Sequence, residues 1–138
     1  MKTNYLLLCL FISFITYSQS NIDKVVGEAE KNICDCTKTA LIQNGVDILK
    51  LVEISNLYKA KKSVPNSYSS AIQKLYKQIN SNVSAISSDI NTCRQNFKSN
   101  PKFQPYFSNK LFLEKLEHRL DLNNYYYGPN LIKKLAKK

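Results

Sequence analysis

A repeat of apolar residues at alternating steps of four and three positions constrains this chain more than any other feature. The repeat is clearest at eight positions: Ile72, Tyr76, Ile79, Val83, Ile86, Ile90, Cys93 and Phe97. Such spacing gathers the apolar side chains on one face of a helix. Lysine, serine and asparagine fill most of the positions between them. The pattern predicts one long amphipathic helix over about residues 69–97.

The same spacing recurs closer to the N-terminus. The positions there are Ile22, Val26, Ala29, Ile33, Cys36 and Ala40. Asn44-Gly45 follows and offers a left-handed end to this helix, because glycine adopts a positive φ without strain. Asp47 can then cap a second helix through its carboxylate.

The C-terminal third begins with a loop that contains Pro101 and Pro105, which forbid a continuous helix there. Helix is expected to resume near Ser108 or Asn109, with Phe112 and then Leu116 and Leu120 on one face. The alternation of apolar and polar residues that is typical of strands is absent. We therefore expect an all-α fold, a single-domain bundle of four or five helices held by a disulfide.

The N-terminus resembles a secretory signal. Lys2 precedes an apolar run, and the small residues Thr16 and Ser18 suit cleavage after position 18. The run is too short to span a bilayer comfortably. We predict a cleaved signal peptide at residues 1–18, an exported helical domain at residues 19–138, and a periplasmic or extracellular location; a retained anchor is the alternative.

Three cysteines follow this leader: Cys34, Cys36 and Cys93. Cys36 and Cys93 hold equivalent positions in their repeats, which predicts a disulfide between them. It would close a loop of about 57 residues and stabilise the fold by about 4 kcal/mol. Cys34 lies about 200° around the helix from Cys36 and would be a free thiol near the surface. A Cys34–Cys93 bridge is the alternative if the helix begins after Cys34, and the absence of any bridge is a third possibility.

Catalytic and metal-binding patterns are weak. Three thiolates with His118 could form a zinc site, but His118 falls on the flank of its helix between charged residues. Glu114, Glu117 and Asp121 alternate with lysine and arginine, as on a solvated helix face. We expect no enzyme activity, no metal and no cofactor.

Aromatic residues concentrate in the last third of the chain, interleaved with lysines. The candidate partner-binding residues are Phe103, Tyr106, Phe107, Tyr125, Tyr126 and Tyr127. Tyrosine joins an apolar ring to a polar hydroxyl and is favoured at interfaces. The alternative is a lid of aromatic residues that closes one end of the bundle.

A short cationic amphipathic segment, residues 130–138, ends the chain. Lys133, Lys134, Lys137 and Lys138 are the candidates for contact with an anionic surface, within a chain of net charge +10. Docking of this segment on the bundle is the alternative. Nucleic acid is not an expected partner of an exported protein.

The leading functional hypothesis is a small exported non-catalytic helical protein that binds a protein or envelope partner. One alternative is a cationic peripheral binder of anionic membrane or polyanion. Another is a thiol or metal protein that uses Cys34, Cys36 and Cys93.

Overall fold

The structure is a computed structural model that describes the backbone of residues 3–137 and the side chains of residues 21–137. Within this part of the chain the fold is all-helical, which confirms the predicted class. The helices are α1 (Thr3–Gln43), α2 (Ile48–Lys61), α3 (Ser69–Ser81), α4 (Val83–Ser99), α5 (Lys110–Leu122) and α6 (Asn124–Leu135). Two short 3₁₀ turns, Asn66–Tyr68 and Gln104–Tyr106, precede α3 and α5. The described residues thus form six α-helices, where the sequence indicated four or five.

The single long helix predicted over residues 69–97 is wrong, because the chain breaks at Asn82 between α3 and α4. Asn82 has φ −115° and ψ 20°, and its side-chain amide donates to the backbone carbonyls of Asn44 (3.2 Å) and Gln78 (3.3 Å). Asparagine and serine compete for backbone hydrogen bonds in this way and weaken a helix locally. The break lets α3 pack on α6 and α2 while α4 packs on α1.

The last helix begins earlier than the predicted segment 130–138. Asn123 caps α6, since its side-chain oxygen accepts a hydrogen bond from the backbone N–H of Tyr125 at 3.0 Å. The three consecutive tyrosines are therefore helical, and Pro129 lies within the helix. Pro129 is the sixth residue of α6 and has no N–H to donate to the carbonyl of Tyr125, so the helix lacks one intrahelical hydrogen bond there.

Other local predictions are confirmed. Gly45 follows the end of α1 with a φ of 73°, and the backbone N–H of Val46 bonds to the carbonyl of Leu41 at 3.0 Å. Asp47 caps α2 through a 3.1 Å bond from the backbone N–H of Lys50. Asn109 caps α5 in the same manner.

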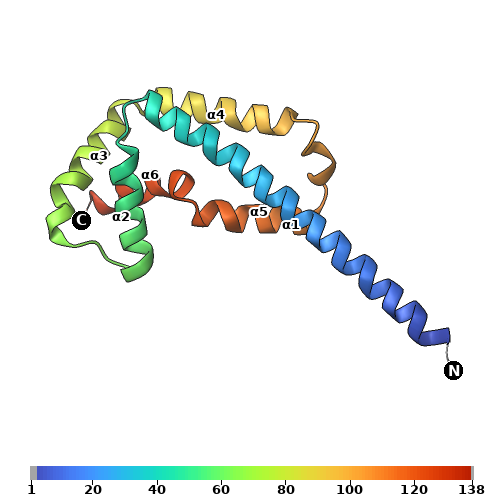
Figure 1. Cartoon of the computed structure of the whole chain (residues 1–138). Helices are drawn as coiled ribbons and strands as arrows, with labels where there is room; N and C mark the ends of the chain where they lie inside the picture. Colours follow the sequence, from blue (N-terminus) through green and yellow to red (C-terminus); the bar gives the residue numbers. More distant parts are fainter. Residues whose placement is uncertain (1–2, 138) are drawn as a thin grey trace.

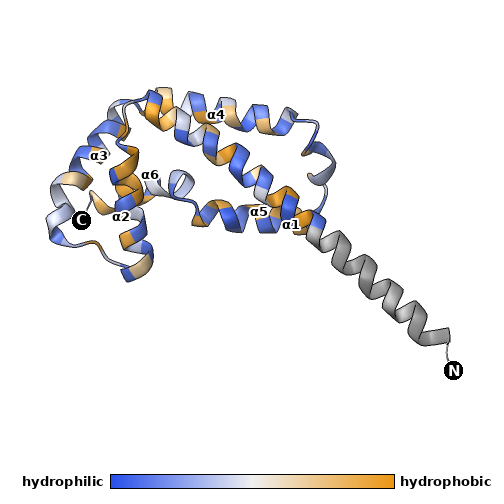
Figure 2. Ribbon diagram, viewed as in Figure 1, coloured by the Kyte–Doolittle hydropathy of each residue, from blue (hydrophilic) through white to orange (hydrophobic). Residues whose placement is uncertain are grey.

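Figure 1 shows the arrangement, in which α4 and α5 flank α1 while α2, α3 and α6 gather around its C-terminal end. Apolar and polar residues alternate along the helices, as the orange and blue segments in Figure 2 show, and buried apolar side chains of different helices pack against one another. Because α1 has neighbours on two sides, its buried surface is wider than one apolar seam.

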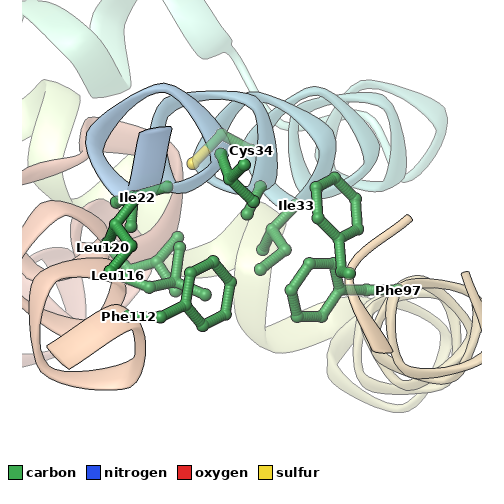
Figure 3. Packing of buried hydrophobic residues seen from close by; sticks show 11 residues of the cluster. Ile22, Ile33, Cys34, Phe97, Phe112, Leu116 and Leu120 are labelled. Atoms are coloured by element: carbon green, nitrogen blue, oxygen red, sulfur yellow. The ribbon is translucent and has the colours of Figure 1, made fainter. Parts of the chain in front are cut away.

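Among the described side chains, the core consists of two apolar clusters. The first joins α1 to the end of α4 and to α5; Figure 3 shows it with Ile22, Ile33, Phe97, Phe112, Leu116 and Leu120 labelled. The second joins the end of α1 to α2, α3, the start of α4 and α6. Tyr125, half-buried in α6, packs against both clusters. This residue links the two parts of the core.

No helix among the described residues has both the length and the apolar character needed to cross a membrane. The predicted signal peptide, residues 1–18, has no described side chains, and its assignment stays a prediction.

Candidate functional site

Two of the cysteines form a structural cross-link. A disulfide joins Cys36 of α1 to Cys93 of α4 with a Cα–Cα distance of 5.8 Å. The bridge fixes the register of the two helices, and it is compatible with an exported protein, because disulfides persist in oxidising compartments.

Among the residues with described side chains, Cys34 carries the free thiol, but the expected position near the surface is wrong. Its side chain is only 4% exposed and belongs to the first apolar cluster, where Figure 3 labels it. The face of α1 opposite Cys36 meets α5 rather than water. Burial raises the pKa of the Cys34 thiol to about 12, so this thiol stays protonated at neutral pH and is a weak nucleophile.

The groups considered for catalysis lie on the outer face of α5. His118, Glu114, Glu117 and Asp121 are all exposed, and Glu114 forms a 3.6 Å ion pair with Lys110. Among the described residues, no three His, Cys, Asp or Glu side chains gather as they would around a metal ion. The geometry brings these groups into no common site.

The aromatic candidates divide into two sets. Phe103 is buried, and its ring lies 5.0 Å from that of Phe97. Phe107 contacts the same ring at 5.4 Å, edge to face, and Tyr106 lies 5.5 Å from Phe112. This loop therefore closes one end of the first cluster as a lid.

The tyrosines of α6 take a different position. Tyr125 and Tyr126 are half-buried and line a cleft together with residues of α1, α3 and α4, whereas Tyr127 lies outside it. The ammonium group of Lys38 lies 5.5 Å from the centre of the Tyr125 ring, a cation–π contact. Of the predicted aromatic patch, Tyr125 and Tyr126 are therefore the residues that lie at this cleft.

We call this concave site the α4–α6 cleft, and its volume is about 410 Å³. It is lined by residues of four helices: Thr37, Ile79, Val83, Ile86, Ser87, Ile90, Asn91, Arg94, Tyr125, Tyr126, Pro129, Asn130 and Lys133. The volume falls within the range of small-molecule binding sites. The aliphatic side chains come from α3 and α4, and the tyrosines face them from α6.

Two cations border the cleft, Arg94 from α4 and Lys133 from α6. No carboxylate is among the lining residues, and within the described part of the chain neither cation forms an ion pair. Asp89, the acidic residue nearest to Arg94 in the sequence, accepts a 2.8 Å hydrogen bond from the side chain of Asn44. The cleft therefore has an uncompensated positive charge.

The lysines of the C-terminal segment are dispersed. Lys133 lines the cleft, Lys134 and Lys137 are exposed, and Lys138 lies outside the described residues. Two apolar side chains of this segment are buried, since Leu131 is 1% and Ile132 0% exposed, and Leu135 and Ala136 are partly buried against the second cluster. The segment docks on the bundle in this structure.

Sequence reasoning missed Arg94 and the exposed part of the apolar repeat. Val83 is 39% exposed and Ile90 is half-buried, although the repeat assigned both to the core. One signal was available: Arg94 directly follows Cys93 and lies four residues after Ile90, at the edge of the apolar face.

Comparison with protein-family models, with curated proteins and with solved structures finds no match to this chain.

Proposed function

We propose that this protein is a small, exported, non-catalytic helical protein that binds a protein or envelope partner through the α4–α6 cleft. The observation that carries the proposal is the cleft itself, in which aliphatic side chains face Tyr125 and Tyr126 beside unpaired cations. Apolar walls with a few convergent polar groups are typical of binding sites. The disulfide between α1 and α4 holds two of the walls in place.

Surface binding through the C-terminal lysines has less support. An amphipathic segment that inserts into a membrane surface needs a free apolar face. Here Leu131 and Ile132 are already buried against the bundle. Membrane binding by this route would require α6 to detach and expose the second apolar cluster.

Ser87 and Ser88 offer a matched test of the cleft. Both are exposed residues of α4, but only Ser87 lines the cleft. A tryptophan at position 87 would fill the cleft, and a tryptophan at position 88 would not. Thermal unfolding followed by circular dichroism checks that both variants fold like the wild type.

The assay measures cosedimentation of the purified protein with an envelope fraction from the cells that produce it. We expect Ser87→Trp to lose at least tenfold in binding, and Ser88→Trp to bind like the wild type. Equal binding by the wild type and Ser87→Trp would refute a role for the cleft. Steeply salt-dependent binding by all three proteins would instead favour the surface lysines.

A further inference from the structure

The α4 wall of the cleft has a linear shape. Val83, Ile86 and Ile90 follow one another at steps of three and four residues on one face of α4, over a length of about 10 Å at 1.5 Å per residue. Ile79 of α3 extends the row beyond Asn82. All four side chains are aliphatic and branched. Val83 is exposed and Ile90 half-buried, whereas Ile79 and Ile86 are buried and present little surface, so the row offers a narrow apolar track rather than a flat platform for a ring.

The charge lies at an end of this track. Arg94 is four residues beyond Ile90 and therefore on the same face, one turn further along α4. Asn91 is also among the lining residues, and its side-chain amide can donate a hydrogen bond. A guanidinium binds carboxylate and phosphate oxygens through two parallel hydrogen bonds. With no carboxylate in the lining, an anionic group meets attraction here and no opposing negative charge.

Lys133 adds a second positive charge from α6, on the wall that faces the track. The net charge of the whole chain, +10, favours the approach of anions over long distances. A cationic or neutral amphiphile would bury Arg94 and Lys133 without a partner, at a cost in free energy. The charge pattern thus selects the headgroup, and the aliphatic track selects the tail.

We propose that the occupant of the α4–α6 cleft is a linear acyl chain that ends in an anionic headgroup, a carboxylate or a phosphate. The aliphatic chain lies along Val83, Ile86 and Ile90, and the headgroup binds Arg94. This inference rests on the proposed function of the cleft and gives the chemical class of its envelope partner.

The test titrates the full exported protein with dodecanoate, dodecyl phosphate, dodecanol and dodecyltrimethylammonium in a calorimeter, each below its micelle concentration. These probes share one tail and differ in headgroup. We expect the two anions to bind and the alcohol and the cation to bind at least tenfold more weakly. The ratio between dodecanoate and dodecyl phosphate distinguishes a fatty acid from a phospholipid headgroup as the source of the anion.

Two variants locate the anion. Arg94→Gln removes the α4 cation of the cleft and leaves Lys133 in place, and Lys98→Gln removes an exposed cation one turn further along α4 that does not line the cleft. We expect Arg94→Gln to weaken dodecanoate binding about tenfold, the loss of one charge-assisted hydrogen-bonded pair, and to leave dodecanol binding unchanged. Lys98→Gln is expected to bind dodecanoate like the wild type.

Equal binding of dodecanoate and dodecanol, or unchanged binding by Arg94→Gln, would overturn the inference. So would the absence of binding to every probe while Ser87→Trp still loses envelope binding. In that case the cleft keeps its proposed function with an occupant of another class, such as an acidic protein segment. If Ser87→Trp retains envelope binding, the proposed function fails as well.

Discussion

We predict that alanine substitutions at two glycines inside helices, Gly27 of α1 and Gly128 of α6, change the free energy of unfolding in opposite directions. Within a helix, alanine is more favourable than glycine by up to about 1 kcal/mol, because glycine loses more backbone entropy on folding. A Cβ at Gly27 would meet only the Nη1 atom of Arg119, at 3.2 Å. Since that atom ends a long side chain that can turn aside, we expect Gly27→Ala to stabilise the protein by about 0.5–1 kcal/mol.

At Gly128 the space is already filled. A Cβ there would lie 3.0 Å from Cδ1 of Leu51 and 3.1 Å from Oγ of Ser55. Both side chains are 0% exposed, so α2 and α6 must move apart to accept the methyl group. Overpacking of this kind costs about 1–3 kcal/mol, which exceeds the gain in helix propensity. We expect Gly128→Ala to lower the free energy of unfolding by about 1–2 kcal/mol.

Urea unfolding without reductant, followed by far-UV circular dichroism, measures both variants. Ser55→Ala sharpens the test, because Oγ of Ser55 is buried and has no hydrogen-bond partner among the described residues. Its removal is expected to stabilise the protein by about 1 kcal/mol and to reduce the cost of Gly128→Ala by about 0.5–1 kcal/mol, a coupling typical of residues in contact. The reasoning is refuted if Gly128→Ala stabilises the protein as Gly27→Ala does, or if the two effects at Ser55 and Gly128 are additive.

Three further predictions concern the cross-link, the free thiol and one carboxylate. Replacing Cys36 and Cys93 together by serine should lower the free energy of unfolding by about 4 kcal/mol, measured against the oxidised wild type in urea; an effect under 1 kcal/mol would contradict a structural role. Alkylation at pH 8 should leave Cys34 unmodified in the folded protein and modify it fully in denaturant, as read by intact mass, because burial raises its pKa to about 12; rapid labelling of the folded protein would show an accessible thiol. The hydrogen bond from Lys50 lowers the pKa of Glu53, so this carboxylate contributes stability above about pH 4.3, its usual pKa, and loses it as the pH falls further. Glu53→Gln should flatten the pH dependence of urea unfolding in that acidic range, and an unchanged profile would contradict the assignment.

Local signals in the sequence were sufficient for several elements. Gly45 ends α1 because the backbone there needs a positive φ, and Asp47 begins α2 because its side chain accepts a hydrogen bond from a free backbone N–H. The equivalent repeat positions of Cys36 and Cys93 predicted the disulfide that the structure contains. These features depend on residues close in sequence or on one period shared by two helices.

Features that depend on a second neighbour were missed. Cys34 is buried because α1 packs on α5 as well as on α4, and one apolar seam gives no information about a second contact face. The break at Asn82 was hidden for the same reason, since the repeat continues across it and one of its stabilising contacts is with Asn44, distant in sequence.

The candidate site was likewise predicted only in part. The aromatic composition predicted interface surface, yet Phe103 became part of a lid and only Tyr125 and Tyr126 reached the cleft. Arg94 gave only one weak signal in the sequence, its place at the edge of the apolar face, because its position beside the cleft depends on α6, which lines the same cleft.

The sequence alone determined the helical class and several helix ends, because backbone capping and the 3.6-residue period act over a few residues. It favoured the pairing of Cys36 with Cys93 and left the alternatives open until the structure showed that bridge. The tertiary structure decided which apolar side chains are covered. Val83 and Ile90 follow the same repeat as the buried Ile86, and only the path of α6 leaves them beside a cleft instead of inside the core. Whether a side chain is buried depends on the surface that packs against its helix, and the sequence of one helix does not specify that surface.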